Sequence, residues 1–148
     1  MPCRYVIDKE RRLVISTAWD RVTFEEMKAH DDQLRNDPEF APEFDQLADG
    51  TRVTVVEGAI DQVRTLAGRS PFAATSRRAF VANSPSVYGM ERLMTTHIEM
   101  SKTPSHVGVF RDVPSALEWL GLEVLPEAIK PQDAKKAPAG TTRNDRTA

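Results

Sequence analysis

Few side chains in this sequence combine the residue types and spacings that chemistry needs. The three histidines, His30, His97 and His106, are far apart, and none has a second histidine three or four residues away, as helix-borne metal sites require. The single cysteine, Cys3, closes no internal disulfide and has no evident histidine partner for nucleophilic work. We therefore predict no metal site and no cysteine nucleophile.

Two histidines have acidic neighbours. His30 precedes two aspartates, but consecutive helix residues face different directions, so we interpret it as a hydrogen-bonded filler of a helix stripe rather than a catalytic base. His97 lies near Glu91, Glu99 and several methionines, which would either line a small pocket or pack in the core. We favour core packing, because methionines at helical spacing usually serve it.

The most suggestive segment is the loop over residues 68–78. It places Arg69, Arg77 and Arg78 around Phe72, together with three hydroxyl side chains. The planar arginine fork suits phosphate and carboxylate groups, and positive charge here contrasts with the acidic remainder of the domain. We predict that the three arginines contact an acidic partner or an anionic ligand. The alternative is a solvated connection whose arginines lie near acidic neighbours.

Signatures of common enzyme classes do not occur. The sequence contains no GxGxxG and no GxxxxGK[ST] phosphate cradle, and it has no GxSxG nucleophile elbow. We therefore expect a protein that is not an enzyme and that uses no cofactor.

Strands and helices alternate along the chain and must position these residues. Hydrophobic periodicity predicts strands over residues 4–8, 13–19, 44–48, 78–82 and 106–110. Capping residues and terminal glycines predict helices over 23–36, 58–68, 84–102 and 114–120. A turn at Asp49 and Gly50 is expected to stop the third strand. For the second helix, capping boxes at Thr54 and at Gly58 are alternative starts, and we prefer Gly58 because 53–56 is β-branched.

The resulting order is β-β-α-β-α-β-α-β-α. Strict alternation after an opening hairpin favours parallel strands joined by right-handed crossovers. The fold class is therefore α/β, with a mostly parallel five-stranded sheet and an N-terminal antiparallel hairpin. One face of the strand over 13–19 is far more apolar than the other, so we expect four helices mainly on one face.

Composition limits the domain count and the partners. The 148 residues are 40% hydrophobic and 28% charged, as in an ordinary soluble domain. The formal net charge of −2 gives no electrostatic footprint for nucleic acid. No apolar run is long enough for membrane insertion, and the first residues do not resemble a signal peptide, so we expect a cytoplasmic protein.

The C-terminal segment differs from the rest of the chain. Residues 126–148 contain three prolines and one large aliphatic side chain, Ile129, so they offer little apolar surface to offset the entropy of ordering. We predict one α/β domain over residues 1–125 and a disordered tail over 126–148.

Several phrases carry a resemblance to a known group. They are Tyr5-Val6-Ile7-Asp8 with Leu13-Val14-Ile15, Trp19 followed by Val22-Thr23, Val87-Tyr88-Gly89-Met90, and Val109-Phe110-Arg111-Asp112 with Ala116-Leu117-Trp119-Leu120-Gly121. Over about residues 4–122 the chain resembles small uncharacterised bacterial proteins of the SpoIIAA-like group, which includes STAS domains and SEC14 lipid-binding domains. None of these phrases is a catalytic signature.

The resemblance implies a candidate switch. In the antagonist proteins of this group, a serine at the end of the third strand is phosphorylated ahead of the second helix. Here Asp49-Gly50-Thr51-Arg52 occupies that stretch, and both serines are absent. Thr51 and Thr54 are therefore the candidate phosphorylation sites, against the alternative that this stretch is only a turn.

Two functions follow as expectations. The first is a non-enzymatic regulatory or protein-interaction domain of the STAS-like group, whose partner is a protein and which also allows a homodimer. The second is a small carrier of an apolar ligand or lipid, implied by the SEC14 side of the resemblance and by the methionines of the third helix. We rate the carrier second, because a large cavity would consume much of the single core.

Overall fold

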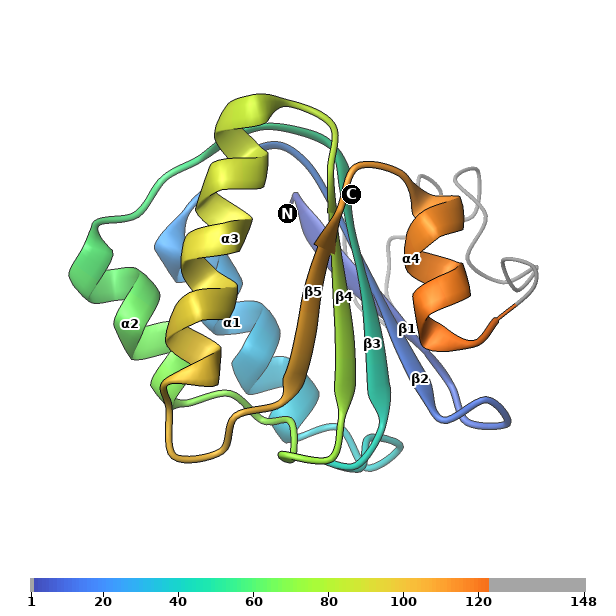
Figure 1. Cartoon of the computed structure of the whole chain (residues 1–148). Coiled ribbons are helices and arrows are strands. Elements are labelled where there is room, and N and C mark those ends of the chain that lie inside the picture. Colours follow the sequence, from blue (N-terminus) through green and yellow to red (C-terminus); the bar gives the residue numbers. More distant parts are fainter. Residues whose placement is uncertain (1, 123–148) are drawn as a thin grey trace.

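A computed structural model describes residues 2–122 of the chain (Figure 1). The elements are, in chain order, β1 (Cys3–Asp8), β2 (Leu13–Val22), α1 (Phe24–Arg35), β3 (Asp45–Val56), α2 (Ile60–Gly68), β4 (Arg77–Ala82), α3 (Pro85–Glu99), β5 (His106–Phe110) and α4 (Val113–Leu120). The predicted order and α/β class are confirmed. The predicted disordered tail lies outside the described residues.

Local sequence signals define three of the helix starts. The Thr23 hydroxyl accepts the N–H of Glu26, whose carboxylate accepts the N–H of Thr23, so the predicted capping box begins α1. Ser84 and Asp112 cap α3 and α4 in the same way, through their side-chain oxygens. Gly121 ends α4 at a φ of 81°, in the left-handed region that favours glycine.

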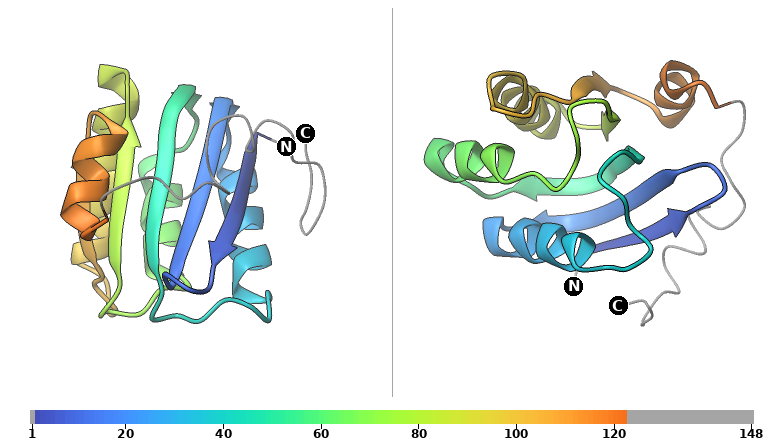
Figure 2. Two further views of the ribbon diagram at one scale, coloured as in Figure 1. Left: turned by 90° about the vertical axis from the view of Figure 1, so that its right-hand side faces the viewer. Right: turned by 90° about the horizontal axis from the view of Figure 1, so that it is seen from below.

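The order of strands in the sheet places three helices on one face. The strands follow one another as β1-β2-β3-β4-β5, with β1 antiparallel to β2 and every later pair parallel. Right-handed crossovers that always advance in the same direction must put their helices on the same side of the sheet. Helices α1, α2 and α3 therefore lie together, and α4, which follows the last strand, covers the opposite face (Figures 1 and 2).

Strand β3 is much longer than its sequence predicts. The strand does not stop in a turn at Asp49 and Gly50 but continues to Val56 alongside β2. The Asp49 carboxylate accepts the N–H and the hydroxyl of Thr51 at 3.0 and 2.7 Å, at a place where the pairing of β2 with β3 shifts register. The local turn chemistry is therefore present, but long-range strand pairing accommodates it as a bulge.

The start of α2 also differs from the prediction. The N-cap is Ala59, one residue after the preferred Gly58, and Thr54 lies within β3. The Ala59 N–H donates to Gln62 Oε1 at 2.9 Å, so a side chain of the helix itself satisfies the backbone N–H of its N-cap. The extended conformation expected for residues 53–56 is confirmed.

Each face of the sheet has its own apolar core. Leu13, Ile15 and Leu47 pack with α4, whereas Val14 and Phe80 face the other three helices. The face of β2 that α1, α2 and α3 cover carries Val14, Ser16 and Ala18, so it is the more polar of its two faces. This small and partly polar surface is where a cavity forms.

Candidate functional site

A cavity of about 180 Å³ lies between the sheet and the helices α1, α2 and α3. A single water molecule needs only about 10–15 Å³ of such space, so this volume exceeds an ordinary packing defect. Apolar side chains make up most of the wall: Val22, Met27, Val53, Val56, Val63, Leu66, Ala67, Phe80, Val87, Met90, Met94 and Ile98. The cavity is therefore suited to an apolar molecule.

Small side chains on the sheet create this space. Ser16 and Ala18 in β2, and Ala48 and Gly50 in β3, all line the cavity at the centre of the sheet. The helices opposite contribute long, flexible methionines, which cannot fill the volume that larger sheet residues would occupy. The void therefore follows from residue size along two neighbouring strands.

Arg78 is the charged group buried in the cavity wall. Its Nε donates to Gln46 Oε1 at 2.9 Å, and its Nη1 donates to Ser70 Oγ at 3.0 Å. The rings of Phe72 and Phe80 lie 4.5 and 5.2 Å from the guanidinium carbon. Burial lowers the pKa of Arg78 to about 10, so the group stays charged at neutral pH.

The partners of Arg78 are all neutral. Within residues 2–122 no carboxylate forms an ion pair with it, and Nη2 has no hydrogen-bond partner there. Burying a cation costs several kcal/mol unless an opposite charge compensates it. Asp31, which also lines the cavity, acts on Arg78 at longer range and partly offsets the effect of burial on its pKa. The cavity therefore contains a fixed positive group that has no ion-pair partner within residues 2–122.

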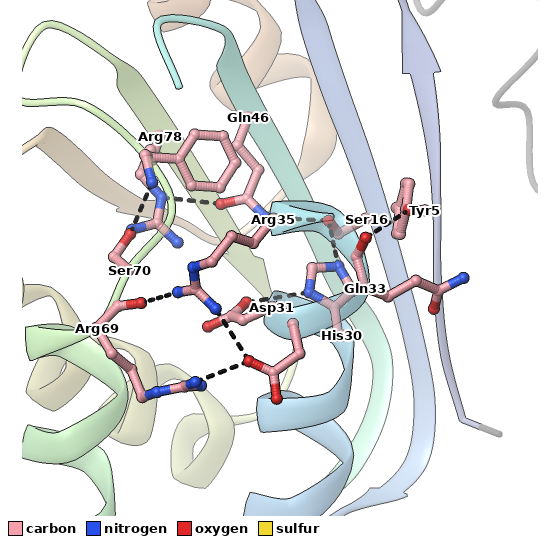
Figure 3. Close-up of polar contacts among 12 residues, drawn as sticks. Tyr5, Ser16, His30, Asp31, Gln33, Arg35, Gln46, Arg69, Ser70 and Arg78 are labelled. Carbon is pink, nitrogen blue, oxygen red and sulfur yellow. Dashed lines mark hydrogen bonds and ion pairs between the residues drawn. The ribbon is translucent and has the colours of Figure 1, made fainter. Parts of the chain in front are cut away.

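A chain of hydrogen bonds connects Arg78 to α1 (Figure 3). Gln46 Nε2 donates to Ser16 Oγ at 3.0 Å, and Ser16 Oγ lies 2.9 Å from His30 Nε2. His30 Nδ1 lies 3.2 Å from Asp31 Oδ1. We assign the Nδ1–H tautomer to His30, since the Asp31 carboxylate accepts; Nε2 then accepts the Ser16 hydroxyl proton, which leaves the Ser16 oxygen to accept from Gln46.

The Asp31, His30 and Ser16 side chains have the order of a serine-hydrolase relay. A serine nucleophile also needs donors for the oxyanion that forms on its substrate. The backbone of Ser16 is paired with Tyr5 on β1 and with Ala48 on β3. Its single N–H therefore faces a neighbouring strand and is not available to an oxyanion. We therefore interpret this relay as a device that holds the Gln46 amide with its oxygen toward Arg78.

Glu91 is the second buried ionisable group of the cavity. Its Oε1 is buried and has no partner within the described part of the chain, and Oε2 lies against the backbone of Gly50. Burial, with a smaller contribution from Asp49, raises the pKa of Glu91 to about 9. The side chain is therefore a neutral carboxylic acid at pH 7, able both to donate and to accept a hydrogen bond.

The three arginines predicted to share one contact surface lie in three different environments. Arg69 pairs with Asp32 at 2.7 Å on the α1–α2 side, and its buried Nη1 has no partner among residues 2–122. Arg77 lies on the α4 face, where it donates to the Trp119 carbonyl and lies 4.6 Å from that ring. Only Arg78 faces the cavity. The expectation of one exposed loop surface is therefore not met, because side chains of consecutive strand residues point to opposite faces.

The candidate phosphorylation sites lie within β3 rather than in a turn at the start of α2. Thr51 is half-buried and donates its hydroxyl to Asp49, whereas Thr54 is exposed. A phosphate on Thr51 would sit beside the Asp49 carboxylate, and like charges repel. Modification of either threonine stays a prediction.

Other candidate residues of the sequence have defined places. Burial raises the pKa of the Cys3 thiol to about 12, so it lines the cavity as a neutral group. Among residues 2–122, no three acidic, histidine or cysteine side chains gather where they could hold a metal ion. None of the helices in that range is long and apolar enough to cross a membrane. The half-buried His30 forms the two hydrogen bonds described above, as a filler of the α1 stripe would.

Sequence reasoning missed most of the cavity. It considered Glu91 and the methionines as a pocket but preferred core packing, and it did not single out Ser16 or Gln46. One signal was available in the sequence. Ser16 in β2 and Gln46 in β3 are polar residues on the helix-covered face of the sheet, and small residues lie near them on the same face. A buried position needs a partner for each polar group, so such residues suggest a network.

A scan of the chain against protein-family models finds no match, and a search of curated proteins finds none either. Among solved structures, the chain is similar to an uncharacterised protein of the DUF3478 family with a SpoIIAA-like fold, from Shewanella loihica PV-4. The two share 19% sequence identity with a TM-score of 0.54, over 80% of this chain and 93% of the other. The chain therefore has a SpoIIAA-like fold, as its sequence resemblance implied. A shared fold does not transfer a function.

Proposed function

We propose that this domain binds a small apolar molecule that carries one anionic head group, without turning it over. The observation that carries this proposal is the buried Arg78, charged and without an ion pair within residues 2–122, in the wall of a cavity lined mainly by apolar side chains. A carboxylate is the head group that fits best, because it matches the arginine fork and restores the missing negative charge.

The surroundings of Arg78 support a pre-organised site. Gln46 and Ser70 fix two of its nitrogens, and two phenylalanine rings hold the guanidinium plane. A side chain already ordered in this way loses little further entropy when a ligand binds. The relay from Asp31 through His30 and Ser16 contributes by fixing Gln46. The apolar remainder of the ligand would contact the valines and methionines of the wall.

The non-enzymatic character of the site is part of the proposal. The N–H of Ser16 itself lies within the sheet and is not available as an oxyanion donor, which supports binding rather than acyl transfer. This favours the carrier that the sequence ranked second. The regulatory role and the protein partner rest on the resemblance alone and stay predictions.

Calorimetry with sodium octanoate and with 1-octanol tests the proposal, because the two probes share a chain length and differ in charge. We expect octanoate to bind at least about tenfold more tightly, a difference of about 1.4 kcal/mol, because only the anion compensates Arg78. An Arg78→Met variant should lose this preference.

Arg77→Met is the matched control, because Arg77 is the adjacent residue on the opposite face of the sheet. It should keep the preference for octanoate. If wild-type protein binds both probes equally, or binds neither, the proposed function is wrong. This comparison needs no variant, so it stays informative even if Arg78→Met does not fold.

A further inference from the structure

The Glu91 carboxyl group lies at the far end of the cavity from Arg78. It packs over Gly50, where an added Cβ would lie 2.9 Å from Glu91 Oε2 and 2.8 Å from the Val81 carbonyl oxygen. Gly50 pairs with Ala82 on β4, whereas Gln46 pairs with Arg78. Four residues along a strand correspond to roughly 13 Å, so Gly50, against which Glu91 of α3 packs, lies well apart from Gln46, the partner of Arg78, along β3.

The orientation of Glu91 has no explanation within the protein. Oε1 is buried without a partner in residues 2–122, although buried polar groups are normally hydrogen-bonded. A glycine at position 50 makes room for the carboxyl group, since any other side chain would collide with it. The Glu91 carboxyl group lines the cavity, and its Oε1 is therefore able to form a hydrogen bond that no residue of 2–122 provides.

We infer that Glu91 recognises an oxygen function, a hydroxyl group, at the apolar end of the ligand whose anionic head binds Arg78. This inference rests on the proposed function and adds to it the chemical class of the ligand, a medium-chain hydroxy acid. A hydroxyl group donates one hydrogen bond and accepts others, so it matches a neutral carboxyl group on both counts. With C–C bonds of about 1.5 Å, a chain of about eight carbons spans roughly 10 Å, and a hydrogen bond of about 3 Å at one end brings this to the roughly 13 Å between Gln46 and Gly50 along β3.

The relative position of the two groups supports a single ligand rather than two. Both line the same cavity, and the wall between them is apolar, with Val53, Phe80 and Met94 among its residues. A charged head at one end and one hydroxyl group at the other would satisfy both buried groups in one binding event. Plain fatty acids would leave Glu91 unpaired.

Calorimetry with 8-hydroxyoctanoate and octanoate tests the inference on the wild-type protein. We expect the hydroxy acid to bind at least about tenfold more tightly, because it forms a hydrogen bond in a water-poor site that octanoate cannot form. A Glu91→Leu variant should bind the two acids equally. A Glu91→Gln variant keeps a donor and an acceptor, and it should retain the preference.

The possible results separate this inference from the proposed function. Equal binding of both acids by the wild-type protein, each more tightly than octanol, would overturn the role of Glu91 and leave the anion site in place. Equal binding of both acids and octanol, or no binding at all, would overturn both. A preference that persists in Glu91→Leu would assign the hydroxyl contact to another residue and also overturn the inference.

Discussion

We expect the stability of this protein to fall as the pH rises from about 5 to 9, and replacing Glu91 with glutamine should abolish most of that fall. The pKa of this carboxyl group is about 9 in the folded protein, against an ordinary value of 4.5. Between these two values the unfolded chain releases the proton while the folded protein keeps it. Rising pH therefore favours the unfolded state, and the free energy of unfolding falls.

The structure gives the size of this effect. One proton of difference between the two states lowers the free energy of unfolding by about 1.4 kcal/mol per pH unit. Between pH 6 and pH 8 the wild-type protein should therefore lose about 2–3 kcal/mol, which corresponds to roughly 10 °C in Tm for a domain of this size. Glutamine has nearly the same shape and no charge at any of these pH values, so the variant should change far less.

Other groups with shifted pKa values act outside this range. The lowered pKa values of Asp32 and Asp112 affect stability only under acidic conditions, below their ordinary values. The raised pKa of Cys3 affects stability only above the ordinary thiol value of 9.0, and the pKa of Arg78 is lowered to about 10. Among these groups, Glu91 alone therefore changes the free energy of unfolding between pH 5 and 9.

Urea unfolding followed by tryptophan fluorescence at pH 5, 6, 7 and 8 measures the effect. Glu99→Gln is the matched control, because Glu99 lies on the same helix but is exposed. It should keep the wild-type slope of stability against pH. Equal slopes for Glu91→Gln and the wild-type protein would refute the reasoning, since Glu91 would then be ionised in the folded state.

Three further predictions concern stability and modification. Gly50→Ala should destabilise the domain by about 1–3 kcal/mol in urea unfolding, because the new Cβ meets the Val81 carbonyl oxygen at 2.8 Å; unchanged stability would show that the site relaxes without cost. Trp119→Ala should cost about 3 kcal/mol, because its ring packs 5.5 Å from Phe110 and 4.6 Å from the Arg77 guanidinium carbon, whereas an unchanged denaturant midpoint would contradict that packing. If β3 carries a phosphorylation switch, mass spectrometry of cellular protein should find phosphate on the exposed Thr54 more readily than on Thr51, and detection on Thr51 alone would contradict this order.

Glu91 and Arg78 illustrate why the candidate site was hard to predict. Both residue types are common on protein surfaces, and their positions in the sequence do not distinguish them from exposed neighbours such as Glu99. Their burial depends on side chains from β2, β3 and three helices that surround one cavity. A pKa of about 9 for a glutamate arises only from this surrounding structure.

Elements with local signals were predictable. Thr23, Ser84 and Asp112 each satisfy N–H groups within three residues, so these helix starts follow from sequence alone. Local patterns also predicted the strands. Apolar and polar residues alternate along β1 and β2, which indicated the hairpin, and later strands alternate with helices, which indicated the α/β order. The existence and order of the strands follow from such short-range patterns, whereas the length of β3 does not.

Tertiary structure decided what depends on contacts between distant segments. Asp49 and Gly50 have strong turn preferences, yet pairing with β2 and β4 keeps them in a strand, because backbone hydrogen bonds on both sides outweigh a local preference. Arg77 and Arg78 are adjacent in sequence, but the pleat sends one to α4 and the other into the cavity. The sequence by itself determined the elements and their order, since those depend on neighbours along the chain. The burial of Arg78 without an ion pair within residues 2–122 arises only when three helices cover two strands of small residues, since burial is a property of the packed molecule.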